Sequence, residues 1–230
     1  MGPLMLCVLA VCAQQLPFGS MPIGGFGGGT GPALVAHTSI AINSASTDVT
    51  SAVNTTGGTI LWAVGSAYNI TSISLADSKS NTWTLAGGAQ STHDGFASAA
   101  WYCLAPTVGT GHTFTLSGGN YYSLTVFAFS GVTTLDQANH TYLTPAVSGT
   151  MQPGSITPTS NGQLIVVGAA TAVGPMSVSL PTFTLTDHSE LNNATIAAYL
   201  IQSTAAAINP TISGVYPGAY DSAAWVLSFR

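Results

Sequence analysis

The chain carries one order of short apolar segments twice, and this internal repeat limits the folds open to it more than any other feature. The two sets lie roughly 100 residues apart and never change order, as a duplicated structural unit requires. The matched segments are Ile60–Gly65 with Gln163–Gly168, Ser72–Leu75 with Ser177–Leu180, Trp83–Leu85 with Phe183–Leu185, Tyr102 with Tyr199, Thr115–Gly118 with Thr211–Gly214, and Ser123–Phe129 with Ser222–Ser228. They predict two copies of a six-strand unit, over about residues 57–131 and 161–230.

The matched segments have the composition of β-strands, because β-branched and aromatic residues fill them and Gly, Asn, Ser and Pro separate them. Phe114 and Leu116 point to one face of their strand while Thr113 and Thr115 point to the other, which is typical of a half-buried antiparallel strand. No stretch combines helical periodicity with helix caps. The sequence therefore predicts an all-β chain.

Three segments are apolar on both faces and are expected to be central or covered strands: Leu61–Val64, Leu164–Val167 and Trp225–Leu227. A further strand over Val35–Ile42 precedes the first copy, which brings the total to about thirteen. The proline-containing segment Thr141–Thr159 is expected to link the copies. Because a six-strand half has too little core of its own, we predict one jelly-roll-type antiparallel β-sandwich over residues 33–230 rather than two independent domains.

Residues 1–32 are predicted to form an extended, apolar arm rich in Gly and Pro. Leu4–Ala13 resembles the apolar centre of a secretory signal, but no basic residue precedes it, and it is shorter than the roughly 20 residues that span a bilayer. The stretch from Gly19 to Pro32 combines many glycines with two prolines, so it cannot hold a helix. We expect this arm to pack on neighbouring subunits, with no part of the chain in a membrane.

Ionised side chains are scarce. Nine of the 230 residues are Asp, Glu, Lys or Arg, against about 57 for a typical composition. Lys79 and Arg230 are the only basic residues, which excludes a nucleic-acid binder that neutralises several phosphates. Ser, Thr and Gly must cover much of the surface, and little charge repulsion keeps copies apart. We therefore expect partners, including symmetry-related copies of the chain, to cover much of this surface.

The three cysteines, Cys7, Cys12 and Cys103, cannot all pair within one chain. Their spacing fits neither a disulfide framework nor a zinc site. The sequence leaves their disulfide state and the redox compartment open.

The sequence offers no catalytic, metal or cofactor site. Asp77–Asn81 has oxygen ligands at alternate positions, but Lys79 replaces a needed carboxylate, so a polar hairpin turn is the favoured interpretation. The five histidines, interpreted as surface or strand-edge residues, lack metal-ligand spacing; they are His37, His93, His112, His140 and His188. Gly24–Gly31 lacks the Lys and the helix of a phosphate loop.

Hydrolytic chemistry is also disfavoured. His93–Asp94 and Asp187–His188 could each supply two members of a catalytic triad, but adjacent strand residues face opposite ways and no nucleophile elbow is present. Glu190 is the only Glu, and the Asp residues are scattered, so paired carboxylates for glycoside cleavage are not expected. We predict that the protein is not an enzyme.

Aromatic residues offer one binding hypothesis, because flat apolar rings with polar edges suit sugar rings. Most lie within predicted strands, where a core role is favoured; these are Trp101, Tyr102, Tyr121, Tyr122 and Tyr142. Tyr216 and Tyr220 lie in a predicted loop and are the candidate ligand-contact residues, with a glycan as the ligand.

Several strings resemble a group of poorly characterised β-sandwich proteins encoded by bacteriophages and bacterial genomes, often among virion structural genes. These strings are DSKSNTWT, AAWYCLAPTVGTGHTFTLSG, LTVFAFSGV, MQPGSITPTSNGQLIVVGAA and AAYLIQSTAAAINPTISG. The resemblance covers roughly residues 33–230 and consists of turn and strand residues, so it brings no catalytic residue with it. It implies a virion part, such as a capsid decoration or tail-associated protein, and it is also compatible with a bacterial surface protein.

Two functional hypotheses follow. The first is a non-enzymatic virion structural protein that binds other virion proteins and copies of itself through apolar, low-charge surfaces. The alternative is a secreted or cell-surface adhesin or carbohydrate-binding module, with the first thirteen residues as its leader and the loop aromatics as its contact. Host, position in a particle and copy number are not encoded in any motif.

Overall fold

The computed structural model describes residues 31–42, 47–68, 71–87, 91–93, 95–143, 149–172, 179–190, 193–213 and 221–230. The predicted arm, apart from residues 31 and 32, lies outside these ranges. The described residues form sixteen strands and no helix, and every pairing between strands is antiparallel. The all-β prediction is confirmed, although the strands outnumber the thirteen expected, because several are only two or three residues long.

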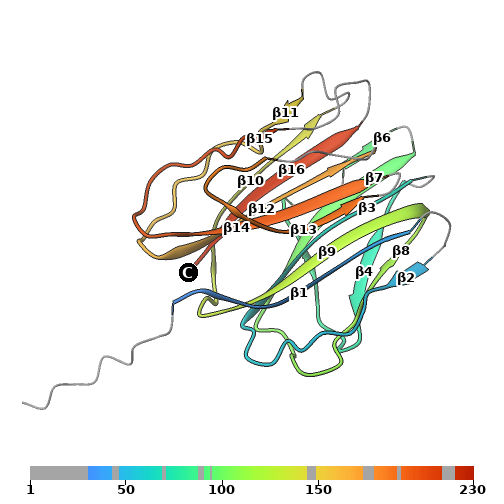
Figure 1. Cartoon of the computed structure of the whole chain (residues 1–230), viewed down its shortest axis with the longest axis horizontal. Helices are drawn as coiled ribbons and strands as arrows, with labels where there is room; N and C mark the ends of the chain where they lie inside the picture. Colours follow the sequence, from blue (N-terminus) through green and yellow to red (C-terminus); the bar gives the residue numbers. More distant parts are fainter. Residues whose placement is uncertain are drawn as a thin grey trace, which may run out of the picture.

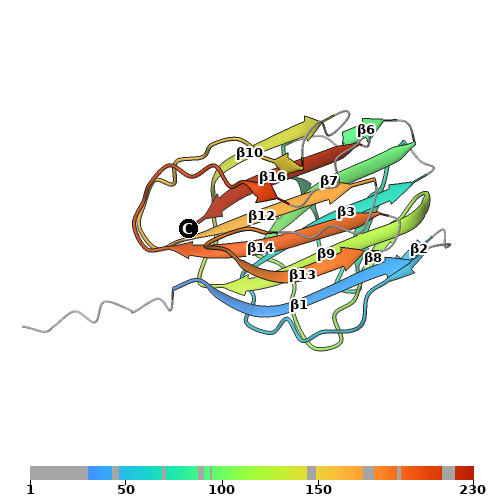
Figure 2. The same ribbon diagram turned by 45° about the horizontal axis from the view of Figure 1, so that its top comes forward.

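Two large sheets lie face to face through the middle of the molecule (Figures 1 and 2). The first large sheet has the order β1 (Ala33–Ile42), β9 (Asn120–Ser130), β3 (Ile60–Tyr68), β7 (Phe96–Leu104) and β5 (Thr84–Leu85), and β6 (Ser91–His93) also pairs with β7. The second has the order β10 (Leu135–Leu143), β16 (Ser222–Phe229), β12 (Gln163–Thr171), β14 (Ala194–Gln202) and β13 (Thr184–Glu190). Each large sheet thus takes its strands from one half of the chain.

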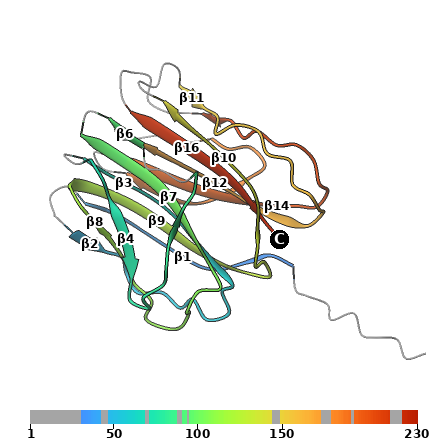
Figure 3. The same cartoon turned by 180° about the vertical axis from the view of Figure 1, so that it is seen from behind.

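A small sheet covers part of the outer face of each large one (Figure 3). The three-stranded sheet has the order β2 (Thr47–Val49), β8 (Phe114–Ser117) and β4 (Ser74–Asp77), and it lies against the first large sheet. The two-stranded sheet consists of β11 (Thr150–Met151) and β15 (Ile212–Ser213) on the second large sheet. The molecule is therefore layered, with the two large sheets inside.

The central core fills the space between the large sheets and contains side chains from both halves of the chain. Its largest members are Trp62, Phe127 and Phe129 from the first sheet and Trp225 and Phe229 from the second, all fully buried. One further core lies between each large sheet and the small sheet that covers it. Since neighbouring strand residues point to opposite faces, β3 and β12 each supply two cores, which explains why both are apolar throughout.

The sequence expectations for these strands are confirmed. Leu61–Val64 and Leu164–Val167 lie in β3 and β12, the middle strands of their sheets, and are fully buried, as is Trp225–Leu227 in β16. Phe114 and Leu116 of β8 point inward. The extra strand predicted over Val35–Ile42 is β1, which begins two residues earlier, at Ala33.

The predicted linker Thr141–Thr159 begins too early and contains a short strand. Its first residues belong to β10, which runs from Leu135 to Leu143 and pairs along β16, and β11 lies at Thr150–Met151. Strand β10 was missed because its sequence LDQANHTYL is polar, and an edge strand can be polar since only part of it is covered.

One glycine sets the spacing of the large sheets. A Cβ atom placed on Gly168 of β12 would lie 2.3 Å from Val64 Cγ2 and 2.7 Å from Trp62 Cη2, both on the facing strand β3. Beside this contact, buried hydroxyl groups join the sheets, with Ser123 Oγ 2.7 Å and Thr125 Oγ1 3.2 Å from Thr195 Oγ1. The two sheets therefore approach closely enough for backbone and short polar side chains to take part in the contact.

Candidate functional site

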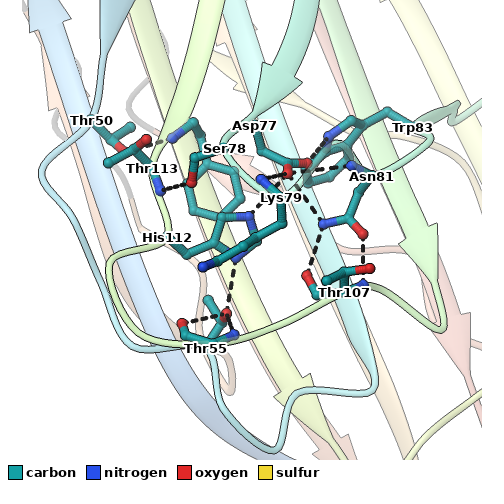
Figure 4. Close-up of polar contacts among 12 residues, drawn as sticks. Thr50, Thr55, Asp77, Ser78, Lys79, Asn81, Trp83, Thr107, His112 and Thr113 are labelled. Atoms are coloured by element: carbon teal, nitrogen blue, oxygen red, sulfur yellow. Dashed lines mark hydrogen bonds and ion pairs between the residues drawn. The ribbon is translucent and has the colours of Figure 1, made fainter.

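The most connected group of polar side chains lies at one end of the three-stranded sheet and is centred on Asp77 and His112 (Figure 4). Asp77 is the last residue of β4, and His112 precedes β8, the strand that pairs with β4. A separate antiparallel bridge joins His112 to Val53, whose backbone exchanges hydrogen bonds of 2.9 Å in both directions with it. Three separate segments of the first half thus hold this cluster.

The Asp77 carboxylate accepts hydrogen bonds from the turn that follows it. Oδ1 accepts from the backbone N–H of Lys79 at 2.8 Å and from the Asn81 backbone and side-chain N–H groups at 3.4 and 3.3 Å. Oδ2 accepts from Trp83 Nε1–H at 2.8 Å. Asn81 also reaches across to Thr107, donating to its carbonyl at 3.0 Å and accepting from its N–H at 2.7 Å. The carboxylate therefore fixes the turn Asp77–Asn81 and orients the indole that follows it.

His112 connects this turn to Thr55. Its Nε2 lies 3.2 Å from Asp77 Oδ1, an ion-pair distance without hydrogen-bond alignment, and its Nδ1 lies 2.9 Å from Thr55 Oγ1. The ring stacks on Phe114, with centroids 4.4 Å apart. Thr55 Oγ1 also accepts from the N–H of Gly109 at 3.1 Å. The side chains of His112 and Asp77 are 0% exposed.

The environment sets the charge of both groups. Burial raises the pKa of Asp77, but the hydrogen bonds from the Lys79 backbone, the Trp83 indole and the Asn81 backbone together hold that pKa below its usual value. Burial lowers the pKa of His112 by more than the neighbouring carboxylate of Asp77 raises it. At neutral pH the pair consists of an ionised carboxylate and a neutral imidazole.

Hydroxyl, imidazole and carboxylate follow one another here in the order of a hydrolase triad, with Thr55, His112 and Asp77 in the three roles. A triad works only if substrate reaches the hydroxyl, whereas Thr55 is buried and the side chains of His112 and Asp77 are fully covered. The Thr55 hydroxyl is further held by the backbone of Gly109. These contacts therefore have a structural role, because they hold three loops in place.

These contacts decide two sequence interpretations. The interpretation of Asp77–Asn81 as a polar turn is confirmed, since Asp77 Oδ1 is occupied by N–H donors of its own turn, but the turn does not close a hairpin, because β4 pairs with β8 and β5 pairs with β7. The interpretation of His112 as a surface or strand-edge residue is wrong, because its ring lies in the core between Phe114 and Thr55. Residues that contact the His112 ring lie far from it in the sequence, so no local sequence pattern predicts these contacts.

Two other histidines join the two halves of the chain. His37 Nδ1 of β1 lies 2.8 Å from Asp187 Oδ2 of β13, and His93 Nδ1 of β6 lies 3.0 Å from Asp221 Oδ1, just before β16. His93 and Asp187, weighed above as parts of catalytic triads, thus each contact a residue of the other half, while Asp94 and the side chain of His188 lie outside what the structure describes. The imidazoles of His37 and His93 are about half exposed, at 45% and 49%.

Most of the aromatic candidates belong to the cores. Trp101 and Tyr122 are buried, and Tyr102 and Tyr142 pack against the central core, which confirms the core interpretation for these four. Tyr216 and Tyr220, the candidate ligand-contact residues, lie outside the described residues, so their role stays a prediction.

A shallow pocket of about 270 Å³ opens between residues 180–183 and residues 208–211 on the second half. Its walls include Leu180, Phe183, Ile208 and Pro210, and none of its lining side chains is ionisable. Pockets that enclose small ligands are usually larger than about 300 Å³ and carry convergent polar groups. This pocket therefore offers no means of acid–base chemistry.

The charged side chains that the structure describes are all engaged within the molecule. Besides Asp77, Asp187 and Asp221, Lys79 Nζ donates to the Thr110 carbonyl at 3.1 Å. Asp136 accepts from Thr159 N–H at 2.8 Å and from its hydroxyl at 2.6 Å, and lies 3.9 Å from Arg230 Nε. Each of the six charged side chains that the structure describes therefore has a partner within the molecule.

The described ranges hold neither a cluster of metal-ligating side chains nor a membrane-spanning helix. No three or more His, Cys, Asp or Glu side chains there cluster as metal ligands would. No helix there has the length and apolarity needed to cross a membrane.

Cys103 is a buried free thiol, and burial raises its pKa, with a further contribution from the charge of Asp77. Cys7 and Cys12 lie outside the described residues.

Comparison with known proteins gives one structural likeness. No protein-family model matches the chain, and no curated protein matches it in sequence. Among solved structures, the PBSX exported protein XepA is similar at a TM-score of 0.21 and 10% sequence identity, with 87% of each chain covered. A score this low does not establish a common fold, and we draw no functional argument from it.

Proposed function

We propose that this protein is a non-enzymatic structural component of a virion, a capsid decoration or tail-associated protein that assembles through uncharged surfaces. The observation that supports the proposal is that every charged side chain the structure describes has a partner within the molecule. These side chains are Asp77, Lys79, Asp136, Asp187, Asp221 and Arg230. Such a surface has few long-range forces to keep copies apart. Its partners are further copies of the chain and other virion proteins.

Buried area, rather than charge pairing, supplies the affinity in this proposal. Covering about 1,000 Å² of apolar surface releases roughly 25 kcal/mol before the costs of association are subtracted. Salt screens interactions between charges but leaves this contribution in place. The assembly is therefore expected to survive 1 M NaCl.

The strand orders support an internal repeat. In each large sheet the strand that comes first along its half lies at the edge, next to the strand that comes last: β1 beside β9, and β10 beside β16. The next positions are β3 and β7 in one sheet and β12 and β14 in the other. We infer that the halves are copies of one unit, and that this unit includes β1 and β10, which lie outside the predicted repeats 57–131 and 161–230.

The sequence predicted one jelly-roll-type sandwich built from both halves, and we propose a jelly-roll path for the first half, where the strand orders support it. In the first half, β2, β8 and β4 form one sheet while β1, β9, β3 and β7 form the other, so the chain passes repeatedly between two layers, as in jelly rolls. Jelly rolls occur in viral capsid proteins and also in lectins. The fold therefore fits the virion proposal, which the resemblance of residues 33–230 to phage-encoded proteins favours over the sugar-binding alternative.

Mass spectrometry of purified particles tests the proposal. We expect the protein to be present at a fixed ratio to the major capsid or tail proteins, with Met1 or Gly2 retained. Absence from particles, together with secreted protein that begins at Gln14, would overturn it and favour the adhesin or carbohydrate-binding module. A glycan array with the wild type and a Y216A/Y220A variant then tests sugar binding directly: binding that the variant loses supports the alternative.

A further inference from the structure

Strand β1 closes one side of the first large sheet, and none of the described strands pairs with its outer edge. It forms a ladder with β9 from Ala33 to Ile42, and no other described strand is hydrogen-bonded to it. Figure 2 shows β1 as the outermost strand on its side, beyond β9 and beside β13. A row of backbone N–H and C=O groups over ten residues is therefore available for another strand.

The other edges of the large sheets carry features that block strand addition. β5 and β6 have only two and three residues. β10 contains Asp136, and β13 contains Asp187 and Glu190 and has a register shift between Leu185 and Asp187. Short length, charge and irregular pairing are the means by which natural proteins protect sheet edges. β1 lacks Asp, Glu, Lys, Arg and Pro, and its only register shift lies at its start, between Leu34 and Ala36.

Strand β1 has one charged neighbour among the described side chains, Asp187 of β13. Its one ionisable residue, His37, contacts Asp187 of β13 and packs against the ring of Phe127. Thr38 donates to the Ser51 carbonyl. Val35, Ala36 and Ile40 pack on the outer core beneath the three-stranded sheet. Both faces of β1 are thus supported from within the molecule, so the strand is held extended and its edge needs no rearrangement to accept a partner.

We propose that β1 pairs antiparallel with β1 of a second copy of this chain, so that two first large sheets become one continuous sheet across a twofold axis. A second copy fits because the same edge is offered by both partners, as an isologous contact requires. Antiparallel pairing brings no like charges together, since β1 has no Asp, Glu, Lys or Arg. The inference rests on the proposed function and names the surface through which copies assemble.

The experiment compares self-association of the full chain and of edge variants by sedimentation velocity over a range of concentrations. Ala41→Lys and Ala33→Lys each place a charge on β1, while the control Ala138→Lys places it on the exposed position of β10, the other long edge strand. We expect each β1 variant to raise the dimer Kd at least tenfold and the control to change it less than twofold. Wild-type Kd in folded β1 variants, or equal weakening by the control, would overturn the inference.

Hydrogen exchange of the wild type gives a readout that does not depend on a variant folding. Backbone amides of residues 33–42 should exchange more slowly as protein concentration rises, while those of residues 135–143 should not change. Protection confined to another segment would refute pairing through β1 but leave self-assembly intact. A chain that stays monomeric at all concentrations would refute both this inference and the proposed self-association.

Discussion

His37 Nδ1 lies 2.8 Å from Asp187 Oδ2 and thereby ties the edge strand β1 of one large sheet to the edge strand β13 of the other. A second pair of the same residue types, His93 and Asp221, joins the halves at β6 and the start of β16. Between them lies the apolar core with its buried hydroxyl contacts. The two halves are therefore held by a shared core whose margins carry histidine–aspartate pairs.

The His37–Asp187 pair should contribute modestly to stability. Burial raises the pKa of Asp187, while the charge and hydrogen bond of His37 lower it, so loss of His37 leaves a poorly solvated carboxylate. Because the imidazole is 45% exposed, solvent screens the interaction. We expect a double-mutant cycle of His37→Ala and Asp187→Ala in urea unfolding to give a coupling of about 0.5–1 kcal/mol. Strictly additive effects would show that the contact contributes nothing.

Removal of the Asp77 carboxylate should destabilise the protein far more. Asp77→Ala leaves the Trp83 indole N–H and the Lys79 and Asn81 backbone N–H groups without their acceptor. The expected loss in the free energy of unfolding is about 3 kcal/mol, measured by urea denaturation. The matched control is Ser78→Ala in the same turn, where one exposed hydrogen bond from Thr113 N–H is lost and about 1 kcal/mol or less is expected. Equal effects would contradict the central role of Asp77.

Acidification should destabilise the fold through His112. Its pKa is lowered by burial, so between its folded pKa and the ordinary value near 6.5 the unfolded chain binds more protons than the folded one. Stability is then fully present above about pH 6.5 and falls as the pH drops toward the folded pKa. Asp77, whose folded pKa is also lowered, adds a further loss below about pH 4.

The corresponding measurement is the free energy of unfolding of the wild type and of His112→Asn between pH 8 and pH 4.5. The variant is less stable throughout, but its stability should change less with pH because the buried titrating group is gone. Parallel curves for the two proteins would show that His112 is not responsible for the acid sensitivity.

A single added methyl group at Gly168 should disturb the contact of the large sheets. Its Cβ would come within 3 Å of Val64 and of the Trp62 ring, which are fully buried and have no room to move away. We expect Gly168→Ala to reduce the free energy of unfolding by about 2–3 kcal/mol, since overpacking of a filled core costs this much. Gly31→Ala is the control, because a Cβ there would meet nothing within 4 Å. An unchanged urea midpoint for Gly168→Ala would mean that the sheets are spaced more widely.

The sequence predicted the parts of this fold that local patterns determine. Apolar runs such as Leu61–Val64 predicted fully buried strands, and the alternation at Phe114 and Leu116 predicted which face of β8 is buried. It missed β10, whose polar sequence gives little strand signal, and it interpreted His112 as a surface or strand-edge residue. The buried ring of His112 is hydrogen-bonded to Thr55 and lies beside Asp77, which are 57 and 35 residues away, and such long-range partners leave no trace in a short window of sequence.

Sedimentation velocity of the purified full chain, at low salt and in 1 M NaCl, tests the central claim that copies associate through uncharged surfaces. The account predicts a concentration-dependent assembly whose dissociation constant changes little between the two salt concentrations. A chain that remains a single monodisperse species up to millimolar concentration, or an assembly that falls apart in 1 M NaCl, would contradict it.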